Sequence, residues 1–127
     1  MKIRVYYEDT DLGGIVYHPN FIKFCERDRS EYFFQKGGTP HFEGGGFVVV
    51  KIEADFKAPA RLGDLLEVKS DVVSVKGTSL VLKQEVLKED ILLFSMVVKL
   101  AFVKDEKVGR MPLHYQEYLL KLFSQAL

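Results

Sequence analysis

The chain has 127 residues, of which 47% are hydrophobic and 28% charged, and its 18 basic residues equal its 18 acidic residues. This size and composition are typical of one globular domain, which we predict to span residues 1–127. A net charge of zero excludes bulk electrostatic attraction to nucleic acid or to an anionic membrane, so any anionic ligand must be bound by local groups.

The first predicted element is a short strand over residues 2–8, with Ile3, Val5 and Tyr7 on one face. Its opening segment, MKIRVYYEDTD, lacks the apolar run of a secretory signal. The pair Gly13-Gly14 then breaks the strand pattern and predicts a turn.

A long helix is predicted to begin at or near Pro19, because proline suits the first helical position. A residue before proline is disfavoured in helical geometry, so we expect His18 to be non-helical and close to the N-cap. Asn20 is a second N-cap candidate. The helix is expected to end at Gly37-Gly38.

One face of this helix is predicted to be apolar at both ends and charged in the middle. Asp28 and Arg29 lie on it, and its apolar members are Phe21, Ile22, Cys25, Tyr32 and Phe33. Two interpretations remain open. The middle of the helix faces solvent, or the charged pair faces a partner subunit.

A loop over residues 38–46, with GGG at 44–46 as a flexible stretch, is expected to precede four strands. These strands are predicted at 47–58, 65–75, 78–88 and 91–103, joined by the turns RLGD and VKGTS. A last helix begins at Pro112, and its inner stripe is predicted to be Leu113, Leu119, Leu120 and Phe123. Successive strands with short turns indicate an α+β fold, a curved antiparallel sheet around one helix.

Membrane and cysteine-based functions are not indicated. The longest apolar run, residues 91–103, contains Lys99 and is too short for a membrane span, which needs about 20 apolar residues. A single cysteine, Cys25, excludes an intrachain disulfide and a cysteine-based zinc site. These features predict a cytoplasmic protein.

The sequence does not contain the common catalytic motifs or a complete set of metal ligands. The sequence has no G-x-S-x-G elbow, no P-loop and no G-x-G-x-x-G after a strand. The segment DTDLGG resembles a calcium loop, but Gly13 and Asn20 stand where ligands are required. A transition-metal site from Asp9, Asp11 and His18 has a single nitrogen ligand, and we predict no metal site.

The segment YYEDTDLGGIVYHPNF then favours acid–base or nucleophilic chemistry at a helix start. A helix N-terminus offers unbonded N–H groups that can stabilise an oxyanion. Asp11 could accept a proton from water or attack a carbonyl, with His18 and Tyr7 orienting the reactants. The alternative remains open that Asp9 and Asp11 shape the turn, that Tyr7 is an ordinary strand residue and that His18 is a surface or capping residue.

The segment YYEDTDLGGIVYHPNFIKFCERDRSEYF closely resembles the opening of hot-dog-fold acyl-CoA thioesterases. These form the 4-hydroxybenzoyl-CoA thioesterase family, and the match is to its YbgC-type, Tol-Pal-associated branch. The specific pattern is Tyr, an Asp four residues later, Gly-Gly-x-Val-Tyr-His-x-x-Phe and Glu-Arg-x-Arg. FKAPARLGDLLEV extends the resemblance, which covers nearly the whole chain. Asp28 departs from the branch, which commonly has a small residue there.

The resemblance implies a five-stranded antiparallel sheet wrapped around the long helix, and dimers whose sheets join edge to edge and often pair into tetramers. It implies hydrolysis of acyl-CoA to a carboxylic acid and CoA, with no metal and no cofactor. Asp11 matches the family's catalytic aspartate, and His18 matches the position whose backbone N–H polarises the carbonyl. In the YbgC-type branch, Tyr7 and His18 also match active-site residues.

A neutral protein must hold the phosphates of CoA with local groups. The candidates are Arg61, Lys76, Thr78 and Ser79, at predicted turns, although each also fits a solvated turn residue and Arg61 could instead pair with Asp64. Acyl carrier protein is a possible partner. A non-catalytic module that binds acyl-CoA or acyl carrier protein, and a hydroxyacyl-thioester dehydratase, are the alternative functions.

Overall fold

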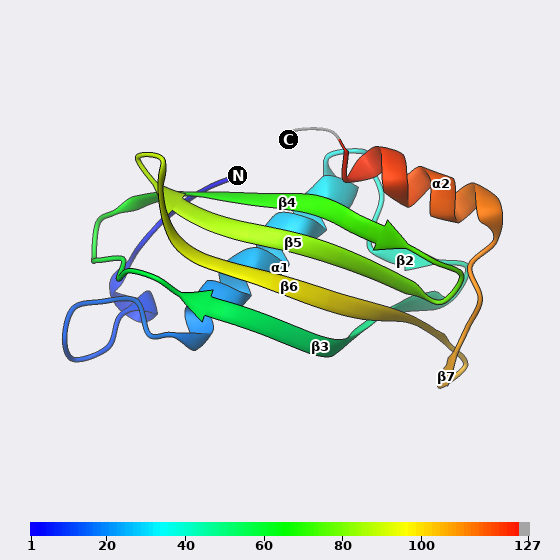
Figure 1. Cartoon of the computed structure of the whole chain (residues 1–127), viewed down its shortest axis with the longest axis horizontal. Helices are drawn as coiled ribbons and strands as arrows, with labels where there is room; N and C mark the ends of the chain where they lie inside the picture. Colours follow the sequence, from blue (N-terminus) through cyan, green and yellow to red (C-terminus); the bar gives the residue numbers. More distant parts are fainter. Residues whose placement is uncertain (125–127) are drawn as a thin grey trace.

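The computed structural model describes residues 1–124. An antiparallel sheet curls around one long helix, and a second helix lies at one end (Figure 1). The elements in chain order are β1 (Lys2–Arg4), the 3-10 helix η1 (Tyr7–Asp9), α1 (Pro19–Phe34), β2 (His41–Phe42), β3 (Gly45–Phe56), β4 (Leu65–Val75), β5 (Ser79–Lys88), β6 (Ile91–Lys104), β7 (Lys107–Val108) and α2 (Leu113–Leu122). The predicted α+β class is confirmed.

The strands of the sheet follow the order β1-β4-β5-β6-β3-β2, and β7 pairs with β6. The predicted five strands correspond to β1 and β3 to β6. The sequence pattern missed the strands β2 and β7, which have two residues each. Since β2 pairs only with Gly45 and Gly46, the outer edge of β3 from Phe47 to Phe56 has no neighbouring strand in the described part of the chain.

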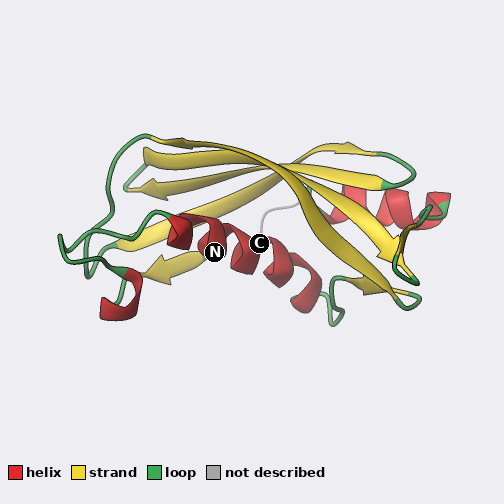
Figure 2. Ribbon diagram, turned by 90° about the horizontal axis from the view of Figure 1, so that it is seen from below, coloured by secondary structure: helices red, strands yellow, loops and turns green. Residues whose placement is uncertain are grey.

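The strands predicted at 78–88 and 91–103 are confirmed as β5 and β6, and their buried residues alternate along each strand. Leu82 is paired with Val98 and Val86 with Phe94, and all four side chains are buried. Figure 2 shows α1 lying beneath the sheet. Phe94 stacks on Phe21 of α1, so the buried side chains lie on the face that the helix covers. Burial of this face against the helix supplies the main stabilisation of the fold.

The predicted strand over residues 2–8 is wrong beyond Arg4, where β1 ends. Ile3 and Val5 are buried as expected, but Tyr7 is 83% exposed. The carboxylate of Asp9 accepts a hydrogen bond from the Tyr6 N–H (2.9 Å), and the chain turns into η1. A local side-chain acceptor therefore ends the strand, as Asp side chains often do.

The predicted inner stripe of the last helix is half correct. Leu119 and Phe123 are buried, but Leu113 and Leu120 are 68% and 43% exposed. The inner face is completed instead by Tyr115 and Leu122. The Phe123 ring lies 4.9 Å from Tyr32 and 5.7 Å from Phe33, so contact with the end of α1 sets the rotation of α2.

The predicted loop over residues 38–46 contains the β2–β3 hairpin. Glu43 and Gly44 turn the chain with φ of 46° and 82°. Gly45 is buried rather than part of a flexible stretch. It lies so close to the Phe102 ring that a Cβ at this position would overlap Cζ of that ring. The second glycine of GGG is thus required by close packing.

We expect Gly45→Ala to lower the free energy of unfolding by about 1–3 kcal/mol, because the new methyl group overpacks against the Phe102 ring. Gly46→Ala is the matched control, because its Cβ would meet the edge of the His41 ring at 3.2 Å, and that exposed ring can shift away. Urea denaturation of both variants tests this expectation. Equal effects at the two positions would contradict it.

The middle of α1 holds a buried polar network, and both interpretations offered for Asp28 are wrong. Asp28 is 0% exposed within the chain. Its carboxylate accepts hydrogen bonds from Ser70 Oγ (2.6 Å) and from the amino group of Met1 (3.0 Å). Ser70 is paired with Gln84 on the inner face of the sheet, so two polar strand residues face the helix at this point.

Burial raises the pKa of Asp28 above its ordinary value, although the hydrogen bonds from Ser70 and the Met1 amino group oppose the shift. The folded state therefore takes up a proton at this carboxyl more readily than the unfolded state. Lowering the pH from neutral to about 4 should thus stabilise the protein relative to an Asp28→Asn variant.

The measurement is the difference in free energy of unfolding between the protein and its Asp28→Asn variant across this pH range. Asp71→Asn, which changes an exposed carboxylate on β4, serves as the control. A difference that stays constant or moves in favour of the Asn variant as the pH falls would show that Asp28 is not the titrating group.

Candidate active site

The segment between η1 and α1 folds into a tight loop. Thr10 and Val16 form an antiparallel bridge, and the Asp11 N–H donates to the Ile15 carbonyl (2.9 Å). The Gly14 N–H donates to the Asp11 carbonyl (3.1 Å), and Gly14 has a φ of 76°, a conformation that glycine adopts without strain. The loop therefore places Asp11 at a fixed point before the helix.

The loop is fastened to the turn between β3 and β4. Ile15 forms a bridge with Arg61, and the Val16 N–H donates to the Ala60 carbonyl (2.8 Å). Both segments lie at the left end of the molecule in Figure 1, where α1 begins.

Asp9 is a structural residue of this junction. It is 8% exposed, and besides capping η1 it accepts two hydrogen bonds at its carbonyl, from the Tyr17 N–H and from Asn20 Nδ2, both at 2.9 Å. These bonds join the residue before the loop to the residues after it. Asp9 thus fits the expected turn role.

Asp11, in contrast, is exposed. Its Oδ1 accepts a hydrogen bond from the Gly13 N–H at 2.8 Å, which is the contact of a turn-forming aspartate. Within residues 1–124, its other carboxylate oxygen accepts no hydrogen bond. The side chain therefore shapes the turn and also presents an oxygen to an incoming reactant.

The start of α1 differs from the prediction at His18, which is the N-cap but has helical dihedrals, φ −51° and ψ −37°. The preference that proline imposes on the preceding residue is outweighed here. The Asn20 N–H donates to the Tyr17 carbonyl (2.8 Å) and the Phe21 N–H donates to the His18 carbonyl (3.3 Å), so helical turns begin before Pro19.

The His18 N–H finds no acceptor in the described part of the chain. Pro19 has no N–H, and the next two amide groups are engaged in the turn. One unbonded donor is therefore left at the positive end of the helix dipole. This is the geometry that stabilises negative charge on an oxygen atom.

Aromatic side chains fix the position of the His18 ring. It packs edge-on against Tyr17, at a centroid distance of 4.9 Å, and against Phe56 of β3, at 5.9 Å. Phe94 of β6 lies 5.0 Å from Phe56 and stacks on Phe21 at 5.2 Å. The core of the protein thus extends directly to the helix start.

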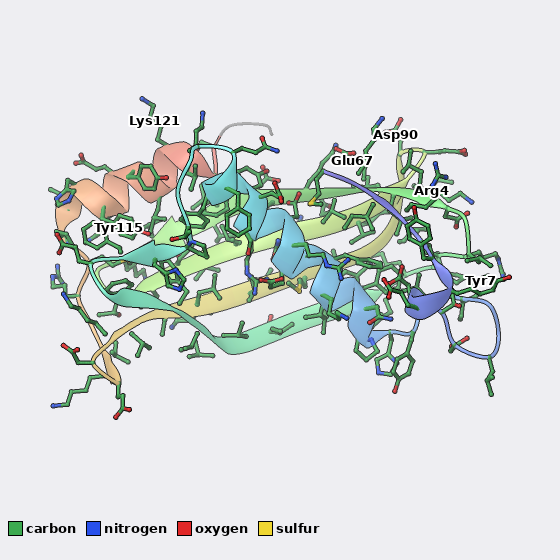
Figure 3. The ribbon with its side chains drawn as sticks, turned by 180° about the vertical axis from the view of Figure 1, so that it is seen from behind. Arg4, Tyr7, Glu67, Asp90, Tyr115 and Lys121 are labelled. Atoms are coloured by element: carbon green, nitrogen blue, oxygen red, sulfur yellow. The ribbon has the colours of Figure 1, made fainter. Side chains whose placement is uncertain are left out.

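The structure brings Tyr7 and Asp11 together at an open hollow of about 530 Å³, whose wall also includes Tyr17 and Asn20. The His18 ring contacts Tyr17, next to this hollow. Tyr7 projects at the end of the molecule opposite Tyr115 of α2 (Figure 3). Tyr17 is not among the site residues predicted from the sequence, although it directly precedes His18 in the motif.

The CoA candidates are divided between the two ends of the sheet. Arg61 lies beside the loop that carries Asp11. The backbone N–H of Arg61 donates to the Asp64 carboxylate (2.8 Å), whereas the ion pair of Asp64 is with Lys88 (2.9 Å). The turn with Lys76, Thr78 and Ser79 lies at the other end, near the start of α2 (Figure 1). Ser79 is buried there.

Two features are absent from residues 1–124. No group of three or more His, Cys, Asp or Glu side chains is placed to hold a metal ion. No helix in this range is long and apolar enough to cross a membrane.

Comparisons with known proteins agree on one family. A sequence model of the thioesterase superfamily matches residues 13–95. The chain is 49% identical over 86 residues to the acyl-CoA thioesterase YbgC of Helicobacter pylori, covering 68% of this chain and 65% of the relative. It is 43% identical over 93 residues to the acyl-CoA thioester hydrolase YbgC of Escherichia coli, covering 69% of this chain and 68% of the relative.

A solved structure supports the same assignment. The crystal structure described as "Probable Thioesterase from Bartonella henselae" aligns with a TM-score of 0.82 and 32% identity, over 88% of this chain and 97% of that chain. The predicted hot-dog fold is therefore confirmed. The superfamily match, the YbgC relatives and this fold together show that the chain belongs to the thioesterase superfamily, within its YbgC-type branch of hot-dog proteins.

Proposed function

We propose that the protein is an acyl-CoA thioesterase, which hydrolyses the thioester to a carboxylic acid and CoA. The observation that carries the proposal is the exposed carboxylate of Asp11, which shares a hollow with Asn20 in the first turn of α1, together with the unbonded N–H of His18 at the N-cap of that helix. A carboxylate and a carbonyl-binding donor are the two groups that thioester hydrolysis needs. The named activity of the YbgC relatives supports the same reaction.

In this proposal the thioester carbonyl oxygen accepts a hydrogen bond from the His18 N–H. This hydrogen bond becomes stronger as negative charge develops on the oxygen. Asp11 either takes a proton from the attacking water or attacks the carbonyl carbon itself. The thiolate of CoA leaves in both routes and takes up a proton. Tyr7, on the wall of the same hollow, orients the reactants.

The two routes differ in the fate of the water oxygen. A direct attack forms an anhydride between Asp11 and the acyl group, and water then adds to it. Single-turnover hydrolysis in ¹⁸O-labelled water, followed by mass spectrometry of the protein, tests for the anhydride. Label recovered in the Asp11 carboxylate excludes the pure general-base route, because water must then have opened an anhydride at the Asp11 carbonyl carbon.

The proposal includes an assembly of two or four copies in the cytoplasm. The unpaired outer edge of β3 supports it, because a second copy can add its own β3 there and continue the sheet. Arg61 would then contact the CoA bound near its own Asp11, whereas the exposed Lys76 and Thr78 would reach only the CoA of another copy. Ser79, which is buried, would contact neither. Light scattering gives the number of copies directly.

The test of the activity is free-thiol release from a panel of short, long and aromatic acyl-CoAs, with an acyl carrier protein thioester in parallel. Hydrolysis of any member above the uncatalysed rate supports the enzyme. Saturable binding without thiol release would support a non-catalytic binding module instead. Water loss from a hydroxyacyl-CoA would support a dehydratase. A panel with neither turnover nor binding would overturn the proposal.

A further inference from the structure

A second cavity lies away from Asp11, between the later half of α1 and the beginning of β3. Its volume is about 400 Å³, within the range of small-molecule sites. The apolar part of its wall is formed by Phe33, Phe47, Val49, Leu80, Leu100 and Phe123. Its polar part includes Arg29 and Glu26 of α1.

Arg29 is a cation with few partners. It is partly buried, and its one hydrogen bond to a side chain is the 3.3 Å contact from Nη1 to Gln84 Oε1, a neutral amide oxygen. Among residues 1–124, no carboxylate lies within 4.0 Å of its guanidinium, and Glu26 instead accepts a hydrogen bond from Ser30 at 3.1 Å. A guanidinium has five donors, so most of them remain available to a ligand.

The guanidinium is nevertheless held in place by a buried chain of hydrogen bonds through Gln84, Ser70 and Asp28, the Gln84–Ser70–Asp28 relay. Gln84 is 0% exposed, and its Nε2 donates both to the Cys25 carbonyl and to Ser70 Oγ, each at 2.7 Å. With both amide hydrogens engaged, Oε1 of Gln84 must face Arg29. Ser70 in turn donates to the Asp28 carboxylate (2.6 Å), which fixes the direction of its hydroxyl.

A charged group that is desolvated without an ionic partner destabilises a fold, so its retention needs a reason. Burial lowers the pKa of the Arg29 guanidinium, although the Glu26 carboxylate opposes this shift. The relay holds Arg29 in one orientation at the wall of an apolar cavity. A bidentate carboxylate is the partner that matches the planar fork of a guanidinium.

We propose that this cavity binds an aliphatic or aromatic carboxylate, with Arg29 recognising the carboxylate group and the Gln84–Ser70–Asp28 relay positioning Arg29. Arg29 follows His18 by eleven residues of helix, which places it about 16 Å along the axis from the helix start. Within one chain the cavity is therefore separate from the hollow at Asp11. Binding of a carboxylate in this cavity does not require thioester hydrolysis at Asp11.

Calorimetric titration of the protein with octanoate tests the proposal, and octanamide serves as the uncharged probe of the same shape. We expect Arg29→Gln to weaken octanoate binding at least about tenfold, because a charge-assisted bidentate pair is lost, and to leave octanamide binding unchanged. Arg27→Gln is the matched control, because Arg27 is an exposed cation on the same helix. Arg29→Lys should retain part of the affinity.

A stability measurement separates this role from a structural one. Arg29→Gln should leave the melting temperature unchanged or raise it, because a desolvated cation is removed. A large fall in melting temperature would instead assign Arg29 to the fold. Equal affinities for octanoate and octanamide, or an unchanged octanoate affinity in Arg29→Gln, would overturn the proposal.

Two sources of the carboxylate are distinguished by kinetics. Suberoyl-CoA carries a free carboxylate at the far end of its acyl chain, whereas octanoyl-CoA ends in a methyl group. A preference for suberoyl-CoA that disappears in Arg29→Gln would identify the bound carboxylate as the far end of a substrate. The substrate would then reach this cavity in an assembly of several copies. Octanoate binding that depends on Arg29 without such a preference identifies a free acid. The absence of both effects would also overturn the proposal.

Discussion

Asp11→Asn is expected to lower kcat for acyl-CoA hydrolysis by about 10²–10⁴-fold while the protein stays folded and still binds CoA. The amide oxygen of asparagine can accept the Gly13 N–H in place of Asp11 Oδ1, so the turn before the helix is retained. What the variant loses is the ability to take a proton or to attack a carbonyl. Steady-state thiol release and a thermal melt measure the two properties separately.

Asp9→Asn is the matched control for this experiment. It makes the same chemical change two residues earlier, and its amide oxygen can still accept the Tyr6 N–H. We expect its kcat to remain close to that of the unchanged protein. Near-normal kcat of Asp11→Asn against several acyl-CoAs would show that Asp11 is not the catalyst.

The second large effect is on stability. Phe94→Ala should lower the free energy of unfolding by about 3–5 kcal/mol, because it opens a cavity at a fully buried position. Phe94 stacks on Phe21 in the first turn of α1 and contacts Phe56, which packs on His18. The loss should therefore also loosen the helix start and lower kcat at temperatures where the variant is folded.

Urea denaturation measures the first effect, and thiol release at low temperature measures the second. Phe34→Ala is the control, because Phe34 ends the same helix but is 49% exposed. We expect this variant to lose less than about 1 kcal/mol. A similar loss for both variants would show that the aromatic cluster under the helix start does not carry the stability assigned to it.

The sequence predicted the long elements well because their patterns repeat. The strand over residues 65–75 agrees with β4, and the others agree within one or two residues at most ends. Many equivalent side chains along β5 and β6 contribute to the same alternation, so a local exception does not change the assignment. Short elements such as β2 and β7 have too few residues to show a period.

Single interactions explain what the sequence did not predict. The strand at the N-terminus ends early because one carboxylate, that of Asp9, accepts one backbone N–H. Asp28 was placed toward solvent or a partner because its actual neighbours, Ser70 and Gln84, are 42 and 56 residues away in sequence. A signal for this contact was present, since Gln84 interrupts the apolar alternation between Leu82 and Val86.

The candidate site was predicted as a set of residues, but its geometry was not. The motif indicated Asp11 and His18, and the structure adds an unbonded N–H at a residue with helical dihedrals. The sequence pattern does not distinguish a turn-forming Asp11 from a reactive one, because one carboxylate can fill both roles. One oxygen of Asp11 accepts the Gly13 N–H, and within the described part of the chain the other is free to meet a reactant.

The unpaired edge of β3 has a consequence for solubility. Its sequence FVVVKI is rich in β-branched residues, and Val48, Val49 and Val50 are about half exposed. In a copy that has not yet joined a second one, such an edge can recruit strands of unrelated or misfolded chains and begin aggregation. Lys51, Glu53 and Asp55 follow at once and place charges that discourage this pairing. Variants that remove these charges should therefore precipitate from concentrated solution even when their fold is intact.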